Sequence, residues 1–174
     1  MKKKQNGLTL VELMVTLAVA LVLVLVGVPQ FRSMLAGNRA AVDANKLVVA
    51  MQLARSEAVK RNLPVSVCGK NSGGNNCTLG DWTEGIVVFV DPGGGVIGNV
   101  DVAGDIVRVL DAPDGSPVIA DDGDFLRFDI DGSLERPAAP YSFTIHQDGC
   151  VGRNQRTIRV SATGQIDVVA GSCP

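Results

Sequence analysis

The chain has 174 residues, enough for one domain with its own core and an additional segment. Beyond position 62, seven Lys and Arg stand against fifteen Asp and Glu, so this part carries a formal net charge of −8. A domain this acidic repels polyanions, which excludes general nucleic-acid binding unless a local basic patch supplies it.

The first predicted element is a membrane-spanning segment over residues 8–28. Val, Leu and Ala dominate this run, and its length matches the ~20 residues that a helix needs to cross a bilayer. Lys2, Lys3 and Lys4 precede it and are expected to hold the N-terminus in the cytoplasm. A secretory signal peptide and a simple single-span anchor are the alternatives. No A-x-A-like cleavage site ends the run, which argues against the signal peptide.

One acidic residue, Glu12, interrupts the apolar run near its start. A carboxylate within a membrane span costs ~2.5–3.5 kcal/mol on insertion scales, so such a residue indicates a function that involves a partner. The segment GLTLVE at residues 7–12 resembles the processing site of type IV prepilins, with Leu8 in place of the family's usual Phe.

This resemblance implies that a prepilin peptidase removes a leader of residues 1–7 by cutting after Gly7, and that it methylates the new N-terminus at Leu8. It also implies that Glu12 sets the register of a filament by pairing with the freed α-amine of a neighbouring subunit. In such a pair each buried charge relieves the desolvation of the other.

Residues 29–62 are predicted to continue as an amphipathic helix into the head. Pro29, two residues after Gly27, predicts a kink or local melting, and a plain boundary of the membrane helix is the alternative. From Leu8 to Arg61 the helix would be ~80 Å long, which fits a subunit whose membrane half becomes the inner shaft of a fibre. Pro64 disfavours helical geometry before it and ends the helix. The apolar face is expected to comprise Leu47, Ala50, Met51, Ala54 and Ala58.

The end of this helix and the segments after it resemble the GspH/FimT family of minor pilins and pseudopilins. The likeness rests on LARSEAVKRN at 53–62, VSVC at 65–68 and WTEGIVVFVD at 82–91. It implies an α+β type IV pilin fold, in which a long N-terminal α-helix, membrane-spanning in its first half, packs against a C-terminal antiparallel β-sheet head at residues 63–174.

The head reads as short β-branched runs that Gly, Asp, Asn and Pro turns separate. A hairpin turn is predicted at 162–165, and Trp82 is expected to be a packing residue. The predicted strands are 64–68, 85–90, 106–110, 125–130, 141–146, 156–161 and 165–169.

All four cysteines lie in the head and none belongs to a CxxC pair, which favours disulfides in an oxidising compartment over a zinc site. Four cysteines allow three connectivities. Cys68–Cys77 and Cys150–Cys173 are favoured because each bridge closes a local loop, and each would contribute ~3 kcal/mol.

Other motifs predict no chemistry. The GGGVIG segment at 93–98 matches a dinucleotide fingerprint but opens no predicted helix, so it is interpreted as a hairpin loop. The acidic residues that hint at calcium lack the spacing of a calcium loop and are explained by turns. His146 has no candidate nucleophile near it, and neither a metal nor another cofactor is predicted. The acidic residues in question are Asp121, Asp122, Asp124, Asp129 and Asp131.

Arg153, Arg156 and Arg159 concentrate positive charge on the acidic head. They suggest either a phosphate-contacting patch for DNA or solvated strand edges that face the many aspartates. DNA receptors of the FimT type carry a Gly-Arg-x-Arg motif near the C-terminus. After the last predicted turn this chain has GQID at 164–167, and the similar segment GRNQR at 152–156 is one residue too long.

These features predict a minor pilin of a type IV pilus that helps prime assembly and forms part of the pilus tip complex, and that is not an enzyme. The expected partners are other minor and major pilins, the prepilin peptidase and the bacterial inner membrane. The head is expected in the periplasm and later on the extracellular pilus. A tip receptor for DNA in natural transformation and a minor pseudopilin of type II secretion are the alternative hypotheses.

Overall fold

A single long helix begins the molecule. The computed structural model describes residues 9–73, 76–78, 80–101, 103–112, 117–121, 125–136 and 140–174. Helix α1 (Leu10–Arg61) has 52 residues and is about 78 Å long at 1.5 Å per residue. It ends at Asn62, which adopts the left-handed conformation at φ 55°. The predicted helix end before Pro64 is therefore confirmed.

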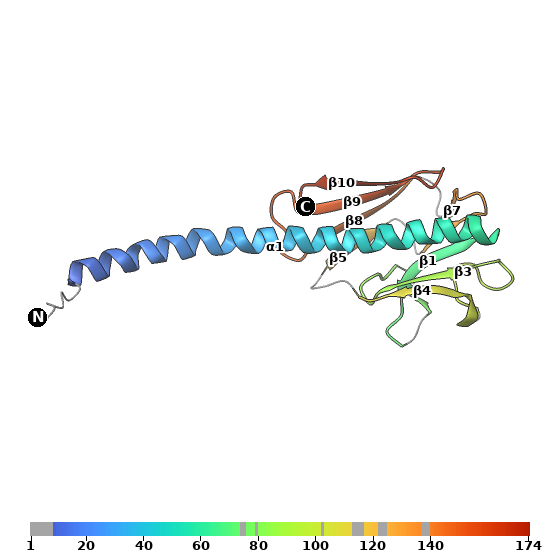
Figure 1. The fold of residues 1–174 in the computed structure, drawn as a ribbon, viewed down its shortest axis with the longest axis horizontal. Coiled ribbons are helices and arrows are strands. Elements are labelled where there is room, and N and C mark those ends of the chain that lie inside the picture. Colours follow the sequence, from blue (N-terminus) through green and yellow to red (C-terminus); the bar gives the residue numbers. More distant parts are fainter. Residues whose placement is uncertain are drawn as a thin grey trace, which may run out of the picture.

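Helix α1 continues through Gly27 and Pro29 without interruption, and Figure 1 shows a long rod with gentle curvature. The helix itself therefore does not end at Pro29, whereas local melting at this position and a plain boundary of the membrane segment there stay predictions. Proline removes one backbone donor, while the turns on either side keep their own hydrogen bonds, so an otherwise regular helix tolerates it. A sharper kink at Pro29 stays a prediction.

The two halves of α1 have different surroundings. Every residue from Thr9 to Arg32 is exposed, whereas the head buries one face from Gly37 onward. The predicted apolar face is confirmed, because all five of its members are at most 2% exposed. The buried residues of α1 are Gly37, Ala40, Asp43, Ala44, Leu47, Ala50, Met51, Ala54, Glu57 and Ala58.

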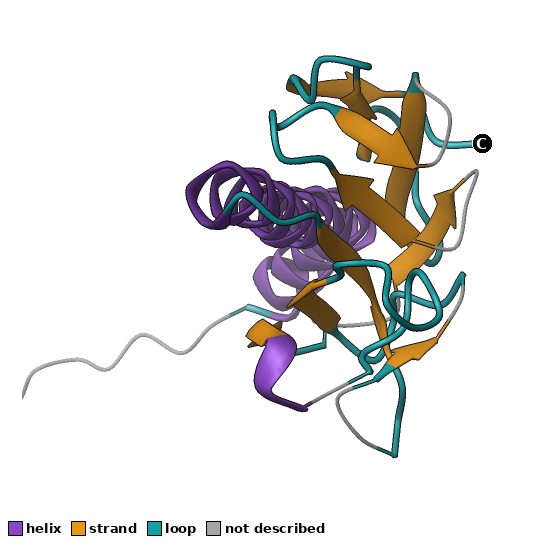
Figure 2. Cartoon of the chain, turned by 90° about the vertical axis from the view of Figure 1, so that its right-hand side faces the viewer, coloured by secondary structure: helices purple, strands orange, loops and turns teal. Residues whose placement is uncertain are grey.

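The head contains two antiparallel sheets that lie on one side of α1 (Figures 1 and 2). The first has the strand order β4-β3-β1-β6-β7, with β2 paired to β1. Its strands are β1 (Val65–Lys70), β2 (Cys77–Thr78), β3 (Ile86–Val90), β4 (Ile106–Leu110), β6 (Phe125–Phe128) and β7 (Leu134–Arg136), and a 3-10 turn, η1 (Ala103–Asp105), precedes β4.

The second sheet has the order β10-β9-β8-β5. The predicted hairpin turn is confirmed between β9 and β10, where the Gly164 amide donates to the Ser161 carbonyl at 2.9 Å. The strands of this sheet are β5 (Pro117–Asp121), β8 (Tyr141–Gln147), β9 (Gln155–Val160) and β10 (Ile166–Gly171). The outermost strands of this sheet are thus β10 and β5.

All seven predicted strands are present, with ends shifted by at most two residues, and three further strands, β2, β5 and β7, were not predicted. The prediction of a strand at 125–130 runs too far, because the chain turns after Phe128. The Gly132 amide donates to the Asp129 carbonyl at 2.8 Å within this turn. It leads directly into β7, which pairs back onto β6.

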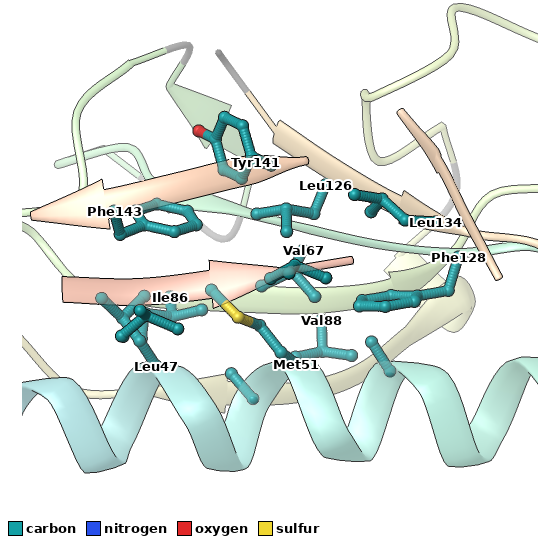
Figure 3. Packing of buried hydrophobic residues seen from close by; sticks show 14 of the residues in the cluster. Leu47, Met51, Val67, Ile86, Val88, Leu126, Phe128, Leu134, Tyr141 and Phe143 are labelled. Carbon is teal, nitrogen blue, oxygen red and sulfur yellow. The ribbon is translucent and has the colours of Figure 1, made fainter. Parts of the chain in front are cut away.

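One apolar core joins α1 to both sheets (Figure 3). Leu47 and Met51 of α1 point towards the strands. Trp82 is 1% exposed and meets Phe143 edge to face, with ring centroids 4.9 Å apart. Phe143 makes a second edge-to-face contact with Tyr141 at 4.8 Å. The packing role predicted for Trp82 is confirmed.

Both predicted disulfides are present. Cys68–Cys77 joins β1 to β2, and Cys150–Cys173 joins the loop before β9 to the tail after β10. Cys68 is fully buried beside Val87 and Phe89, so the first bridge ties the two-residue strand β2 to the interior of its sheet. The second bridge ties the tail after β10 to the loop before β9.

Candidate functional site: the exposed helix and its junction with the head

The first half of α1 is an apolar surface with no cover in the monomer. It contains a window with mean hydropathy 2.7, none of which is buried, and it is long and apolar enough to cross a membrane. Individual side chains are largely open, from Leu10 at 74% to Val28 at 43% exposure. Exposed apolar area of this extent costs free energy in water and requires lipid or other helices around it.

Glu12 lies in the first turn of α1. Its amide donates to the Thr9 hydroxyl at 3.2 Å, and a carboxylate at this position is favoured by the partial positive charge of the helix N-terminus. Thr9 and Glu12 have the T-x-x-E spacing of a helix N-terminal capping box. This spacing, which sequence reasoning overlooked, predicts the start of α1. Among the residues that the structure describes, no cation pairs with Glu12. Gly7 and Leu8, the predicted processing site, lie outside these residues.

An apolar groove of about 560 Å³ lies along the helix near Gly27. A Cβ atom added to Gly27 would meet nothing within 4 Å, so the absent side chain leaves a notch on the surface. Small residues at such positions allow a second helix to approach closely within a membrane. The groove is lined by Leu23, Val24, Gly27, Val28, Phe31, Arg32 and Leu35.

The first polar contact between the head and α1 lies just beyond this groove. The Asn154 side-chain amide donates to the Ser33 carbonyl at 3.1 Å and to the Ser33 hydroxyl at 2.8 Å. Asn154 also covers Gly37, where an added Cβ would come within 2.5 Å of the Asn154 Oδ1 atom. We name Ser33, Gly37 and Asn154 the helix clasp. Sequence reasoning missed it, because Ser33 and Asn154 are 121 positions apart.

Two buried acids tie α1 to itself and to the second sheet. Asp43 is 2% exposed and accepts a hydrogen bond of 3.0 Å from the Gln147 side chain on β8. Glu57 accepts from Arg61 at 2.5 Å and from Lys60 at 3.2 Å. These hydrogen bonds hold the pKa of Glu57 below its ordinary value, and the bond from Arg61 has a larger effect than the bond from Lys60.

A buried charge network anchors the glycine-rich segment 93–98. Asp91, at 2% exposure, accepts from the Gly98 amide at 2.9 Å and lies 3.5 Å from the Arg127 Nε atom. Arg127 also donates to the Asp91 carbonyl at 2.8 Å and pairs with Glu135. The glycine-rich segment is thus a loop held by an aspartate, in keeping with its interpretation as a connection between strands.

The three head arginines do not form one surface. Arg153 is exposed in the loop before β9, while Arg156 and Arg159 lie within β9. Because alternate strand residues face opposite sides of a sheet, Arg156 lies on the face of the buried Ile158 and Arg159 on the other face. Arg159 is also the cross-strand neighbour of Asp167 on β10. The geometry favours charge compensation over a shared phosphate site.

The predicted turn roles of two acidic residues are confirmed. Asp129 accepts from the Ile130 amide at 2.7 Å, and Asp131 accepts from the Ser133 amide at 2.8 Å. Hydrogen bonds from Ser133 hold the pKa of Asp131 below its ordinary value. Within the described part of the chain, no three His, Cys, Asp or Glu side chains are grouped to hold a metal. The structure describes neither Asp122 and Asp124 nor the side chain of Asp121.

A long helix, bare and apolar in its first half and packed in its second half against antiparallel sheets, defines a type IV pilin-like subunit. Comparison with known proteins agrees. Residues 43–164 match the family described as type II transport protein GspH, and residues 2–28 match the prokaryotic N-terminal methylation motif. The first match covers more than half of the chain, which therefore belongs to the GspH family.

Two crystal structures of the type IV minor pilin FimU from Pseudomonas aeruginosa are similar to this chain. One is 23% identical with a TM-score of 0.59, over 79% of this chain and 96% of the chain in that crystal structure. The other is 25% identical with a TM-score of 0.55, over 75% of this chain and 97% of the chain in that crystal structure. A search of curated proteins found no match. The predicted pilin fold and the minor pilin or pseudopilin class are confirmed, and with them a membrane-anchored subunit of a structural family.

Proposed function

We propose that this minor pilin helps prime the assembly of a type IV pilus and forms part of the complex at the pilus tip. The observation that carries the proposal is the exposed apolar half of α1, with Glu12 in its first turn and a folded head at its other end. Such a subunit rests with its helix in the inner membrane and its head in the periplasm. It then transfers the same helix from lipid to the packed helices of a filament.

Glu12 provides the register in this account. Cutting after Gly7 frees an α-amine on Leu8, and this cation on one subunit lies at the membrane depth of Glu12 on the next. Two desolvated opposite charges are stable only when they meet, so a misplaced subunit carries the cost of an unpaired buried charge. The methyl group on the amine leaves it basic.

Substitution of Glu12 tests the proposal. In cells that make the pilus, Glu12→Ala should leave the membrane level of the processed chain unchanged and remove it from sheared pili. Glu12→Asp, which keeps the charge on a shorter side chain, is the matched control and should retain part of the incorporation. Peptide mapping of the mature protein should begin at a methylated Leu8. Normal incorporation of Glu12→Ala, or a retained leader, contradicts the proposal.

A role as a minor pseudopilin of type II secretion is the second candidate, because the matched family is described by a type II transport protein. Deletion of the gene separates the two functions. Loss of surface pili with intact protein secretion supports the pilus, and loss of secretion with intact pili supports the secretion system.

DNA capture at the tip has weaker support from the geometry, since β9 directs Arg156 and Arg159 to opposite faces. Gel shifts with the wild-type chain and an Arg153→Ala, Arg156→Ala, Arg159→Ala variant test it. A DNA receptor loses affinity and salt dependence in the variant. Equal binding by the two proteins rules out this use of the arginines.

A further inference from the structure

The outer edge of β10 carries backbone groups with which no described residue pairs. Ser161 and Gln165 form a hydrogen-bonded pair at the start of the β9–β10 hairpin, with the Ser161 amide donating at 2.9 Å. In an antiparallel ladder, pairs alternate between bonded and non-bonded. The register of Ile166 with Val160 therefore directs the amides and carbonyls of Ile166, Val168 and Ala170 away from β9. Within residues 140–174, all of them described, nothing pairs with these groups.

The side chains along this edge are also open. Val168 and Val169 are each 40% exposed, one on each face of the sheet. An open groove of about 650 Å³ lies between the β9–β10 turn and α1. Ile166, the first residue of the strand, lines one side of it, and Gln52 and Val59 of α1 line the other side. The edge thus combines a free backbone ladder, apolar side chains and adjoining space.

The opposite edge of the same sheet differs. Continuing the alternation through β9 and β8 directs the backbone of Pro117, Ile119 and Asp121 outward from β5. Pro117 has no amide to donate, and proline on an edge strand is a common device against strand addition. Addition of another strand is therefore hindered at β5 by Pro117, whereas β10 has no proline to hinder it.

We infer that β10 accepts an extended strand from a different pilin-type subunit that is anchored in the same membrane. The inference rests on the proposed function for the presence of such neighbours. Strand addition at a free sheet edge combines main-chain hydrogen bonds, which give affinity, with side-chain contacts, which give specificity. Here the main-chain groups of Ile166, Val168 and Ala170 supply the hydrogen bonds. The side chains of Val168 and Val169 supply the contacts that give specificity.

Membrane orientation argues against a second copy as the occupant. A symmetric pair of β10 strands uses the same residues on both partners and is antiparallel. Since β10 runs along the helix, back towards its membrane half (Figure 1), such a pair would direct the two membrane helices in opposite directions. Both helices enter the membrane with one orientation, so this pair cannot form there. Pairing with β5 of a second copy meets the edge that Pro117 guards.

Residue-resolved amide exchange of the full chain in detergent, alone and mixed with each pilin-type subunit encoded beside it, tests the inference. In the chain alone, the amides of Ile166, Val168 and Ala170 should exchange fast, while those of Asp167 and Val169, which bond to β9, are slow. In a complex, exchange at the first three should slow by at least about tenfold. This alternate pattern distinguishes strand pairing from other contacts.

Two variants complete the test. Val168→Pro removes the outward amide without breaking a bond to β9 and should weaken the complex about tenfold or more. Val168→Ala keeps the backbone and is the matched control, with a smaller loss. A complex in which the three amides still exchange fast overturns the inference alone, whereas absence of any complex overturns the proposed function as well. Slow exchange of the three amides in the isolated chain would show that this edge is already paired, within the chain or with a second copy in the detergent, and would also overturn the inference.

Discussion

Gly37→Ala separates two opposing contributions at the helix clasp. Alanine is about 1 kcal/mol more favourable than glycine inside a helix. The new methyl group, however, would come within 2.5 Å of the Asn154 side chain and displace it. Asn154 then loses its hydrogen bonds to the Ser33 carbonyl and hydroxyl, each with a net contribution of about 1 kcal/mol. The expected result is a net destabilisation of about 1 kcal/mol.

The sign should reverse when Asn154 is shortened. In an Asn154→Ala background nothing obstructs the methyl group, so Gly37→Ala should stabilise the chain by about 1 kcal/mol through helix propensity alone. The difference between the two backgrounds, about 2 kcal/mol, is the coupling energy of the clasp. A simple effect of helix propensity predicts the same stabilisation in both.

The four proteins of this cycle can be compared by urea unfolding in detergent, followed through the fluorescence of Trp82, the single tryptophan of the chain. Trp82 is buried and reports on the head. Amide exchange at residues 33–40 adds a local measurement at the clasp itself. Equal stabilisation by Gly37→Ala with and without Asn154 would refute the reasoning.

Three further predictions concern the head and the half of α1 that packs against it. Arg127→Ala leaves the buried carboxylate of Asp91 without its cation and should cost about 3–5 kcal/mol in urea unfolding; a cost below about 1 kcal/mol would show that the pair is not desolvated. Met51→Ala, at a fully buried position, should cost about 2–5 kcal/mol, and an unchanged midpoint would mean that the sheets do not close on this side chain. Because Arg61 lowers the pKa of Glu57, the stabilisation is complete above the ordinary glutamate pKa and is lost as the pH falls through the lowered value. Wild type should therefore lose more stability than Glu57→Gln between about pH 5 and pH 3, and parallel curves would contradict this.

Local patterns in the sequence predicted the elements that local chemistry determines. In the β8 segment YSFTIH, apolar and polar residues alternate, and this period of two predicts a strand. Both disulfides close loops within one hairpin-sized segment, and the helix end follows from the conformational limits of Pro64. These features depend on residues that are neighbours along the chain.

Other features depend on partners that the sequence does not bring together. β5 begins with Pro117, which weakens a strand signal, and β7 has three residues, too few to show a period. The arginine cluster looked continuous because three positive residues lie close in sequence, but alternation within β9 divides Arg156 from Arg159. The clasp and the network of Asp91 with Arg127 join distant segments, and their residues have no distinguishing pattern of their own.

The way the head holds α1 also determines its response to pulling. The sheets contact the helix along its second half, from the clasp at Ser33 to the end at Arg61, and the chain enters β1 only after Pro64. A force applied to the membrane end and directed along the axis therefore acts in shear on the helix–sheet contacts, which share the tension and must slide together. Rupture by peeling, one contact at a time, would require a sideways force at the clasp.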